Sequence, residues 1–477
     1  MKKLLPLIIL LVSFSALAQD GYEIRITFKP FKNQYIYLGH YYGKQLPIID
    51  SALLNDKSEA VFKGNKRLGG GIYLVGYPNK TGFFEILIDR EQKFSVIADT
   101  TNLLNAITFQ NSNDNALFNN YQKFMQVNGR EIDNALKQRQ LATTLKDSVK
   151  WNEVINKINK TIQQYRDDEM KKNPSSMLTF LLTAMREPEV PAKEKQPGAK
   201  YDSAFAYRYY KDHFWDGINF FDERLSRTPF FETKLDKYFE QVVYQHPDSI
   251  NKEIDWMLGY ASVNEEMQKF LLLKFINHYL NQKYMWEDAV FVHLFEKYLA
   301  QKNYTWMTEK GRKTITDRAY SLMANIFGTP ASDIDLPDSS GKNISLYSIP
   351  APYVVVFIFD PTCGHCKETA PKLDSFYQSK WKAMGLKIYA MAKETDGNKT
   401  DWLKFIKELH LNDWTNVYYS KAADKARIDA GIPGYSQLYD VLTFPTLYLL
   451  DKDKRIIAKK LTYQQIDEVL QFRMQTK

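Results

Sequence analysis

Residues 354–366 have the sequence VVVFIFDPTCGHC, in which two cysteines follow closely on an apolar run. The run Val354–Phe359 is continuous and rich in β-branched residues, which is typical of a strand buried on both faces. The apolar spacing that follows, to about Met384, predicts a helix. Cys363 and Cys366 are therefore predicted to lie at a strand-to-helix junction, in the first turn of that helix.

This placement favours thiol chemistry at the two cysteines. The thiolate is the form that attacks disulfides, and an unperturbed cysteine is mostly protonated at neutral pH. The unpaired N–H groups at the start of a helix stabilise an anion, and His365 between the cysteines can add a positive charge or a hydrogen-bond donor. We expect Cys363 to be the more exposed thiol and the nucleophile, and Cys366 to attack the resulting mixed disulfide.

Two other roles for a Cys-x-x-Cys motif are less well supported. Half of a zinc site needs a second pair of ligands, and the chain contains only these two cysteines. A structural disulfide across so small a loop would constrain the unfolded chain little. A redox couple is therefore the favoured interpretation, and neither a metal nor a cofactor is expected.

Segments on both sides of the cysteines resemble the TlpA-like thioredoxins. The upstream sequences GTPA, DLPD, GK and ISL occupy residues 328–331, 335–338, 341–342 and 344–346, and the CGHC sequence itself resembles that of protein disulfide isomerase domains. Downstream, Phe444-Pro445-Thr446 precedes an apolar run, where thioredoxin-like folds place a cis-proline facing the cysteines. The resemblance covers residues 328–477 and implies an α/β thioredoxin-like fold.

The same resemblance implies further site residues. A cis bond at Pro445 would expose backbone at Phe444 to an extended client segment, so Phe444 and Thr446 are expected substrate-binding residues. Thioredoxin itself has a buried acid six residues before its first cysteine, where this chain has Phe357. Related extracytoplasmic reductases often have a glutamate three residues after the second cysteine, and that position is Thr369 here.

Proton delivery to Cys366 must therefore come from another group. The candidates are Asp360, Glu368 and Glu394.

The rest of the chain divides by its periodicity. Period-two alternation from Gly21 to about Phe109 predicts an all-β, sandwich-like domain over residues 19–110, with an antiparallel sandwich or a small barrel as the architecture. Apolar residues at spacings of three and four then predict an all-α region over residues 111–327. The chain is thus predicted to be multi-domain, with the thioredoxin-like domain last, an order that resembles proteins of Bacteroidota-type bacteria.

Residues 1–18 are predicted to be a cleaved signal peptide. Two lysines precede a short apolar run, and Ala16-Leu17-Ala18 forms a small-x-small cleavage site. The apolar run is too short to span a bilayer, and the absence of a nearby cysteine argues against a lipoprotein. We therefore expect a periplasmic protein whose mature chain starts at Gln19.

The charges exclude one class of partner and leave several functions open. The 64 basic and 56 acidic residues are interleaved, which does not favour nucleic-acid binding.

The leading hypothesis is a reductase of client disulfides, recharged by a membrane electron donor of the DsbD/CcdA type. The alternatives are an isomerase or oxidase of the same fold, and a binding module in residues 19–327 with an accessory thioredoxin domain. The sequence does not determine the oligomeric state.

Overall fold

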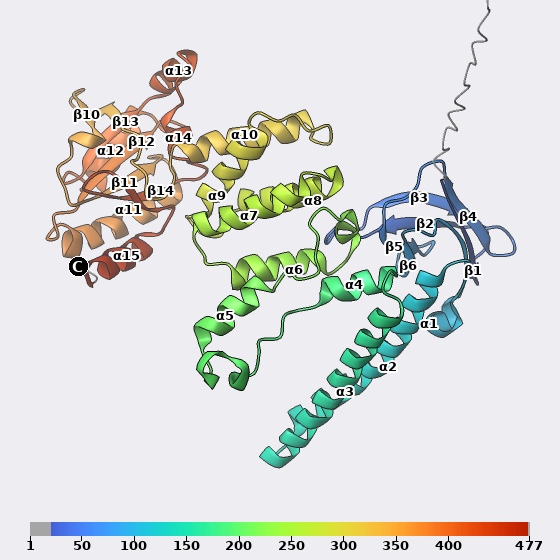
Figure 1. The fold of residues 1–477 in the computed structure, drawn as a ribbon. Coiled ribbons are helices and arrows are strands. Elements are labelled where there is room, and N and C mark those ends of the chain that lie inside the picture. Colours follow the sequence, from blue (N-terminus) through green and yellow to red (C-terminus); the bar gives the residue numbers. More distant parts are fainter. Residues whose placement is uncertain (1–20, 476–477) are drawn as a thin grey trace, which may run out of the picture. The chain divides into compact units, whose positions relative to one another are not determined.

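A computed structural model describes residues 21–475, so the predicted signal peptide lies outside the described residues (Figure 1). The chain forms two compact units. One contains the residues up to Val243 together with Asp255–Leu271, and the other contains Tyr244–Ile254 together with the residues from Leu272 onward. Within residues 21–475, no helix is both long enough and apolar enough to span a bilayer.

The first unit begins with a β-sandwich of two four-stranded sheets, in the orders β4-β1-β7-β8 and β3-β2-β5-β6. Alternate residues of β1, among them Ile24, Ile26 and Phe28, are fully buried in the core between the sheets, as the period-two pattern predicts. The strands are β1 (Tyr22–Lys29), β2 (Tyr35–His40), β3 (Ile48–Leu53), β4 (Glu59–Gly64), β5 (Gly71–Gly76), β6 (Phe83–Ile88), β7 (Lys93–Asp99) and β8 (Thr108–Gln110).

One pairing differs from the antiparallel architecture expected from the sequence. β1 runs antiparallel to β4 but parallel to β7, with Ile24 opposite Phe94 and Ile26 opposite Val96. The strands β2 to β6 lie between β1 and β7 in the chain. The connection is therefore long enough to make the crossover that a parallel pair needs. The sandwich prediction is confirmed, and its purely antiparallel form is wrong.

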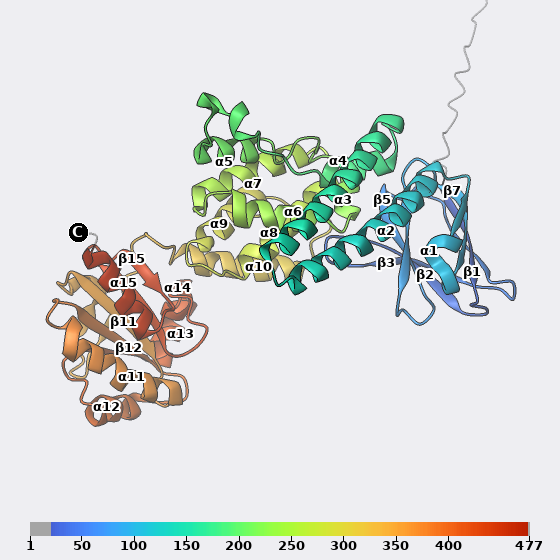
Figure 2. The ribbon, with the colours of Figure 1, turned by 90° about the horizontal axis from the view of Figure 1, so that it is seen from below.

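Helices make up the middle of the chain, as predicted. In the first unit, α2 and α3 are long and lie side by side (Figures 1 and 2). α7 and α8 contribute residues to both units. The helices of this region are α1 (Leu103–Ala106), α2 (Asn113–Leu141), α3 (Leu145–Lys172), α4 (Met177–Met185), α5 (Ser203–Asp212), α6 (Phe231–Lys237), α7 (Pro247–Ala261), α8 (Glu265–Leu280), α9 (Glu287–Leu294) and α10 (Glu309–Met323).

The C-terminal part of the second unit is built on a five-stranded sheet in the order β13-β12-β11-β14-β15. β11 and β12 are parallel, as are β12 and β13, whereas β14 and β15 are antiparallel to their neighbours. The elements are β9 (Asp335–Pro337), β10 (Asn343–Ser345), β11 (Tyr353–Phe359), α11 (Gly364–Phe376), β12 (Lys387–Lys393), α12 (Lys399–Glu408), β13 (Thr415–Tyr419), α13 (Lys421–Asp429), α14 (Tyr435–Leu438), β14 (Thr446–Asp451), β15 (Ile456–Lys459) and α15 (Tyr463–Gln475).

The central strand β11 is buried on both faces, as its apolar sequence predicts. Val355, Phe357 and Phe359 pack in the core formed with α11, α12 and α15. The alternate residues, such as Val354 and Val356, pack on the opposite face with α14 and the segment around β9 and β10. This sheet holds the end of β11, and hence the start of α11, in a fixed place.

A buried ion pair attaches α9 to the edge strand of this sheet. Lys459 on β15 and Asp288 on α9 are each about 4% exposed, and their side chains are paired. The Lys459 Nζ also donates to the Asn325 carbonyl at 2.6 Å and to its side-chain oxygen at 2.8 Å. These bonds satisfy a buried charge that would otherwise be costly in free energy.

We predict that Lys459→Met lowers the free energy of unfolding by about 3–5 kcal/mol, because it leaves the Asp288 carboxylate buried without its cation. The double variant Lys459→Met/Asp288→Leu should recover most of this loss. Calorimetric melting of residues 19–477 measures both. Lys452→Met, at an exposed position in the turn before β15, is the matched control. A double variant less stable than Lys459→Met would contradict the assignment.

Candidate active site

The two cysteines lie at the junction of β11 and α11. Cys363 occupies the N-cap position of α11 in extended backbone (φ −64°, ψ 125°), and Cys366 lies in the first turn. Both thiols are free; Cys363 is partly exposed and Cys366 is fully buried. Solvent can therefore reach one sulfur of the pair and not the other, and the more exposed thiol is Cys363, as expected from the sequence.

The loop before β14 lies against the exposed thiol. The Cys363 thiol donates to the Phe444 carbonyl, with 3.8 Å between sulfur and oxygen, and the Phe444–Pro445 peptide bond is cis. Phe444 and Pro445 are both partly exposed, so their backbone borders the reactive sulfur at the surface. Thr446 is buried, and its hydroxyl donates to the Thr443 carbonyl, so its side chain belongs to the turn.

The environment of Cys366 favours the protonated thiol. Burial raises the pKa of Cys366 far above its ordinary value. A hydrogen bond from the Asp360 amide opposes this rise, whereas the adjoining Cys363 side chain and the Asp360 carboxylate increase the pKa further. In the reduced protein Cys366 is thus a neutral thiol, leaving Cys363 as the sulfur available for attack.

Asp360 is a buried carboxylate between two loops. Its side chain accepts hydrogen bonds from the Thr362 amide at 2.6 Å and the Thr362 hydroxyl at 2.5 Å, both at Oδ1. Its Oδ2 accepts from the Thr395 hydroxyl and, at 3.2 Å, from the Asp396 amide. Burial by itself would raise the pKa of Asp360, but these bonds outweigh it and hold the pKa below its ordinary value.

The Asp360 backbone also supports the cysteines. Its carbonyl accepts from the Cys363 amide at 3.2 Å, while its amide bonds to the Cys366 sulfur. The second loop approaches closely because residue 397 is glycine. A Cβ at Gly397 would lie 2.7 Å from Cγ2 of Thr362 and 2.9 Å from Cγ of Pro361. Asp360 therefore links the turn before Cys363 to the loop after β12.

Comparisons with known proteins identify the family of this domain. Residues 327–459 match the model of the AhpC/TSA family. These residues form a thioredoxin-like domain of the AhpC/TSA family. Residues 155–318, upstream of this thioredoxin-like domain, match a domain of unknown function, DUF5106. No curated protein matches the chain.

Solved structures of bacterial proteins match the chain over 60% of its length or over about the length of its thioredoxin-like domain. A thioredoxin-like protein from Bacteroides caccae is 23% identical over 60% of this chain and 98% of its own, with a TM-score of 0.44. A domain of a possible thiol-disulfide isomerase from Cytophaga hutchinsonii is 32% identical over 32% of this chain and 97% of its own (TM-score 0.27). A thiol:disulfide interchange protein from a Bacteroides species is 27% identical over 31% of this chain and 91% of its own (TM-score 0.26).

The remaining predicted site residues of the thioredoxin-like domain lie nearer the surface. His365 and Glu368 are exposed on the first turns of α11. Glu394, after β12, accepts from the Lys421 amide at 3.1 Å and hydrogen-bonds to Tyr418. Of the three candidate acids, Asp360 is thus the one placed directly against Cys366. Within the described residues, no group of three or more His, Cys, Asp or Glu side chains is placed to hold a metal ion.

Sequence reasoning missed the partners of Asp360 in the thioredoxin-like domain. An Asp followed two residues later by Thr is a signal for a local turn, so the bond to Thr362 could have been expected. Thr395 and Gly397 lie more than thirty residues downstream of Asp360. Their contact with Asp360 follows from the parallel pairing of β11 and β12, which brings the ends of both strands to one edge of the sheet.

We predict that Asp360→Asn lowers the free energy of unfolding at pH 7 by about 2–3 kcal/mol, because an amide does not replace a carboxylate that accepts on both oxygens. The pKa of Cys366 should fall, since a negative charge beside it is removed. Chemical denaturation measures the first effect, and the pH dependence of Cys366 alkylation in a Cys363→Ser background measures the second.

The effect of Asp360→Asn should also depend on pH. The pKa of Asp360 is below its ordinary value, so its stabilisation is present above about pH 4 and is lost as the pH falls through the lowered pKa. The stability difference between wild type and variant should therefore shrink in acid. Asp396→Asn, which alters an exposed carboxylate of the same loop, is the control. A difference that stays constant to pH 2 would contradict this role of Asp360.

Proposed function

We propose that this protein is a periplasmic thiol–disulfide oxidoreductase that reduces disulfides of client proteins through Cys363 and Cys366. The observation that carries the proposal is the pairing of a partly exposed thiol with a fully buried one, beside the Phe444 carbonyl. An extended client segment can pair with backbone at this position while its disulfide meets Cys363. Membership of the thioredoxin-like family supports the same chemistry.

The proposed reaction has two exchange steps. The Cys363 thiolate attacks a sulfur of the client disulfide, so that a mixed disulfide forms and the other client sulfur leaves as a thiolate. Cys366 then loses its proton and attacks the Cys363 sulfur, which releases the second client sulfur and leaves a Cys363–Cys366 disulfide. Two electrons pass to the client, and a membrane electron donor of the DsbD/CcdA type would return two electrons to the protein.

The raised pKa of Cys366 separates the two steps. While Cys366 is a neutral thiol, it does not compete with Cys363 for the client, and its proton must leave before the second attack. The Asp360 carboxylate lies against this thiol, but its lowered pKa makes it an ionised group at neutral pH. We propose that it accepts the Cys366 proton transiently or passes it to the departing client thiolate, in preference to Glu368 or Glu394.

An isomerase is the second candidate, favoured by the exposed His365 between the cysteines. A donor or positive charge near the Cys363 thiolate stabilises the reduced form, which makes the disulfide more oxidising. The two directions differ in a measurable quantity, the reduction potential of the Cys363–Cys366 couple.

We predict a reduction potential near or below about −220 mV after equilibration of the mature protein in glutathione buffers, as for thioredoxin-like reductants. Cys363→Ser should abolish reduction of insulin. Cys366→Ser, as the matched control, should still attack and should accumulate mixed disulfides. A potential at or above roughly −180 mV, with reactivation of scrambled ribonuclease, would assign the protein as an isomerase or oxidant.

The periplasmic location rests on residues 1–18, with their basic start, apolar stretch and Ala-Leu-Ala site. Expressed with these residues in a Gram-negative bacterium, the protein should be recovered from the periplasmic fraction with Gln19 at its N-terminus, as measured by mass spectrometry. Replacement of Leu10 by Arg within the apolar stretch should retain it in the cytoplasm. Cytoplasmic recovery of the intact native chain would exclude export.

A further inference from the structure

The segment that borders Cys363 is held by a helix from outside the thioredoxin-like domain. We call residues 437–445, which comprise the end of α14 and the segment from there to β14, the proline loop. At its end, the Phe444 carbonyl accepts from the Cys363 thiol. In its middle, Asp440 is 2% exposed, and its carboxylate is bonded inside the protein.

Two cations neutralise Asp440. Arg318 on α10 donates to its Oδ1 at 2.5 Å, and the Lys460 side chain bonds to its Oδ2. Burial would raise the pKa of Asp440, but the bonds to Lys460 and Arg318 outweigh it and lower the pKa. A second guanidinium nitrogen of Arg318 donates to the Gln282 side chain at 2.9 Å, and this bond fixes the orientation of the guanidinium group.

Further residues of the same helical face bind the start of the proline loop. The Ser321 hydroxyl donates to the Gln437 carbonyl at 3.3 Å. Asn325, just after α10, donates to the Leu438 carbonyl at 3.2 Å. Positions 318 and 321 are three apart, so they lie on one side of α10, and Asn325 follows the end of the helix. Each of the three side chains donates a hydrogen bond to the proline loop.

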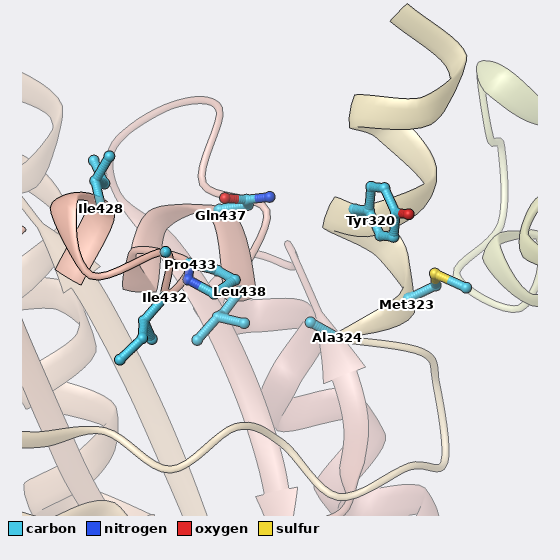
Figure 3. A pocket seen from close by; sticks show the side chains of 9 residues that line it. Tyr320, Met323, Ala324, Ile428, Ile432, Pro433, Gln437 and Leu438 are labelled. Carbon is cyan, nitrogen blue, oxygen red and sulfur yellow. The ribbon is translucent and has the colours of Figure 1, made fainter. Parts of the chain in front are cut away.

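Apolar packing between α10 and this part of the domain is incomplete. Figure 3 shows Tyr320 of α10 and Ala324 at its end on one side of an open space, and Ile432 and Leu438 on the other. The pocket they line has a volume of about 600 Å³. Because side chains on the two sides do not interdigitate here, the polar contacts of Arg318, Ser321 and Asn325 carry the attachment of α10 to the proline loop.

We propose that α10 positions the proline loop against Cys363, with Arg318 as the positioning residue that acts through Asp440. The helical region would then contribute directly to recognition of protein clients. This inference rests on the proposed function, in which a client segment pairs with backbone at Phe444. A small disulfide needs only the Cys363 sulfur, so it should not depend on where the proline loop is held.

The test is Arg318→Gln in the full mature protein. We expect kcat/KM for insulin to fall about tenfold, through KM, because a coupling of this kind contributes on the order of 1 kcal/mol. The rate with hydroxyethyl disulfide should stay within about twofold of wild type, and the reduction potential should be unchanged. Arg312→Gln is the matched control, because Arg312 is also on α10 but donates to the Lys302 carbonyl.

A second measurement does not require activity. Amide hydrogen exchange in the peptide that contains residues 439–446 should become faster in Arg318→Gln than in Arg312→Gln, while exchange in β11 stays unchanged. If the wild-type protein fails to reduce insulin, the proposed function is wrong, and the exchange comparison still tests the attachment. Equal losses with insulin and hydroxyethyl disulfide, or unchanged exchange, would overturn the inference.

Arg318→Lys guards against a variant that fails to fold. Lysine keeps the charge beside Asp440 but gives up the bond to Gln282, so the protein should fold and show a smaller loss that is still selective for insulin. Wild-type kinetics with insulin in Arg318→Lys, together with an unfolded Arg318→Gln, would reduce Arg318 to a stabilising residue and would overturn the positioning role.

Discussion

The candidate site depends on one buried carboxylate at the end of a buried strand. β11 is covered on both faces, so its last residue is fixed, and Asp360 follows directly after it. The Asp360 side chain then binds Thr362 on one side and the loop of Thr395 and Asp396 on the other. An apolar strand alone would place the start of α11 only approximately, and the hydrogen bonds to a charged group give it one geometry.

Thioredoxin itself carries its buried acid on the strand, six residues before the first cysteine. Here that position is Phe357, which stacks on Phe359 with ring centroids 5.0 Å apart. The charge near the second cysteine is supplied instead from the turn, by Asp360. Asp360 precedes the first cysteine by three residues, about half the spacing in thioredoxin. Its carboxylate still raises the pKa of the buried thiol, Cys366.

Much of this arrangement could be predicted from the sequence because it is local. Period-two alternation predicted the sandwich strands, and the run before the cysteines predicted β11. The region of β13, α13 and α14 was not predicted, and α13 shows why: none of its residues is buried, so it has no apolar stripe. The Arg318–Asp440 pair joins residues 122 positions apart, and charges in sequence do not indicate which partner they meet.

The burial of Cys366 also sets the order of events in the proposed cycle. Cys363 is the one sulfur of the pair that reaches the surface, so a client and an electron donor must use the same entrance. They would therefore bind in turn, and the kinetics would be those of a double displacement. Plots of reciprocal rate against reciprocal client concentration, at different fixed concentrations of the electron donor, would then be parallel lines. A client that binds the oxidised protein would block the electron donor, because both use the same entrance. An excess of client would therefore slow the recharging of the protein.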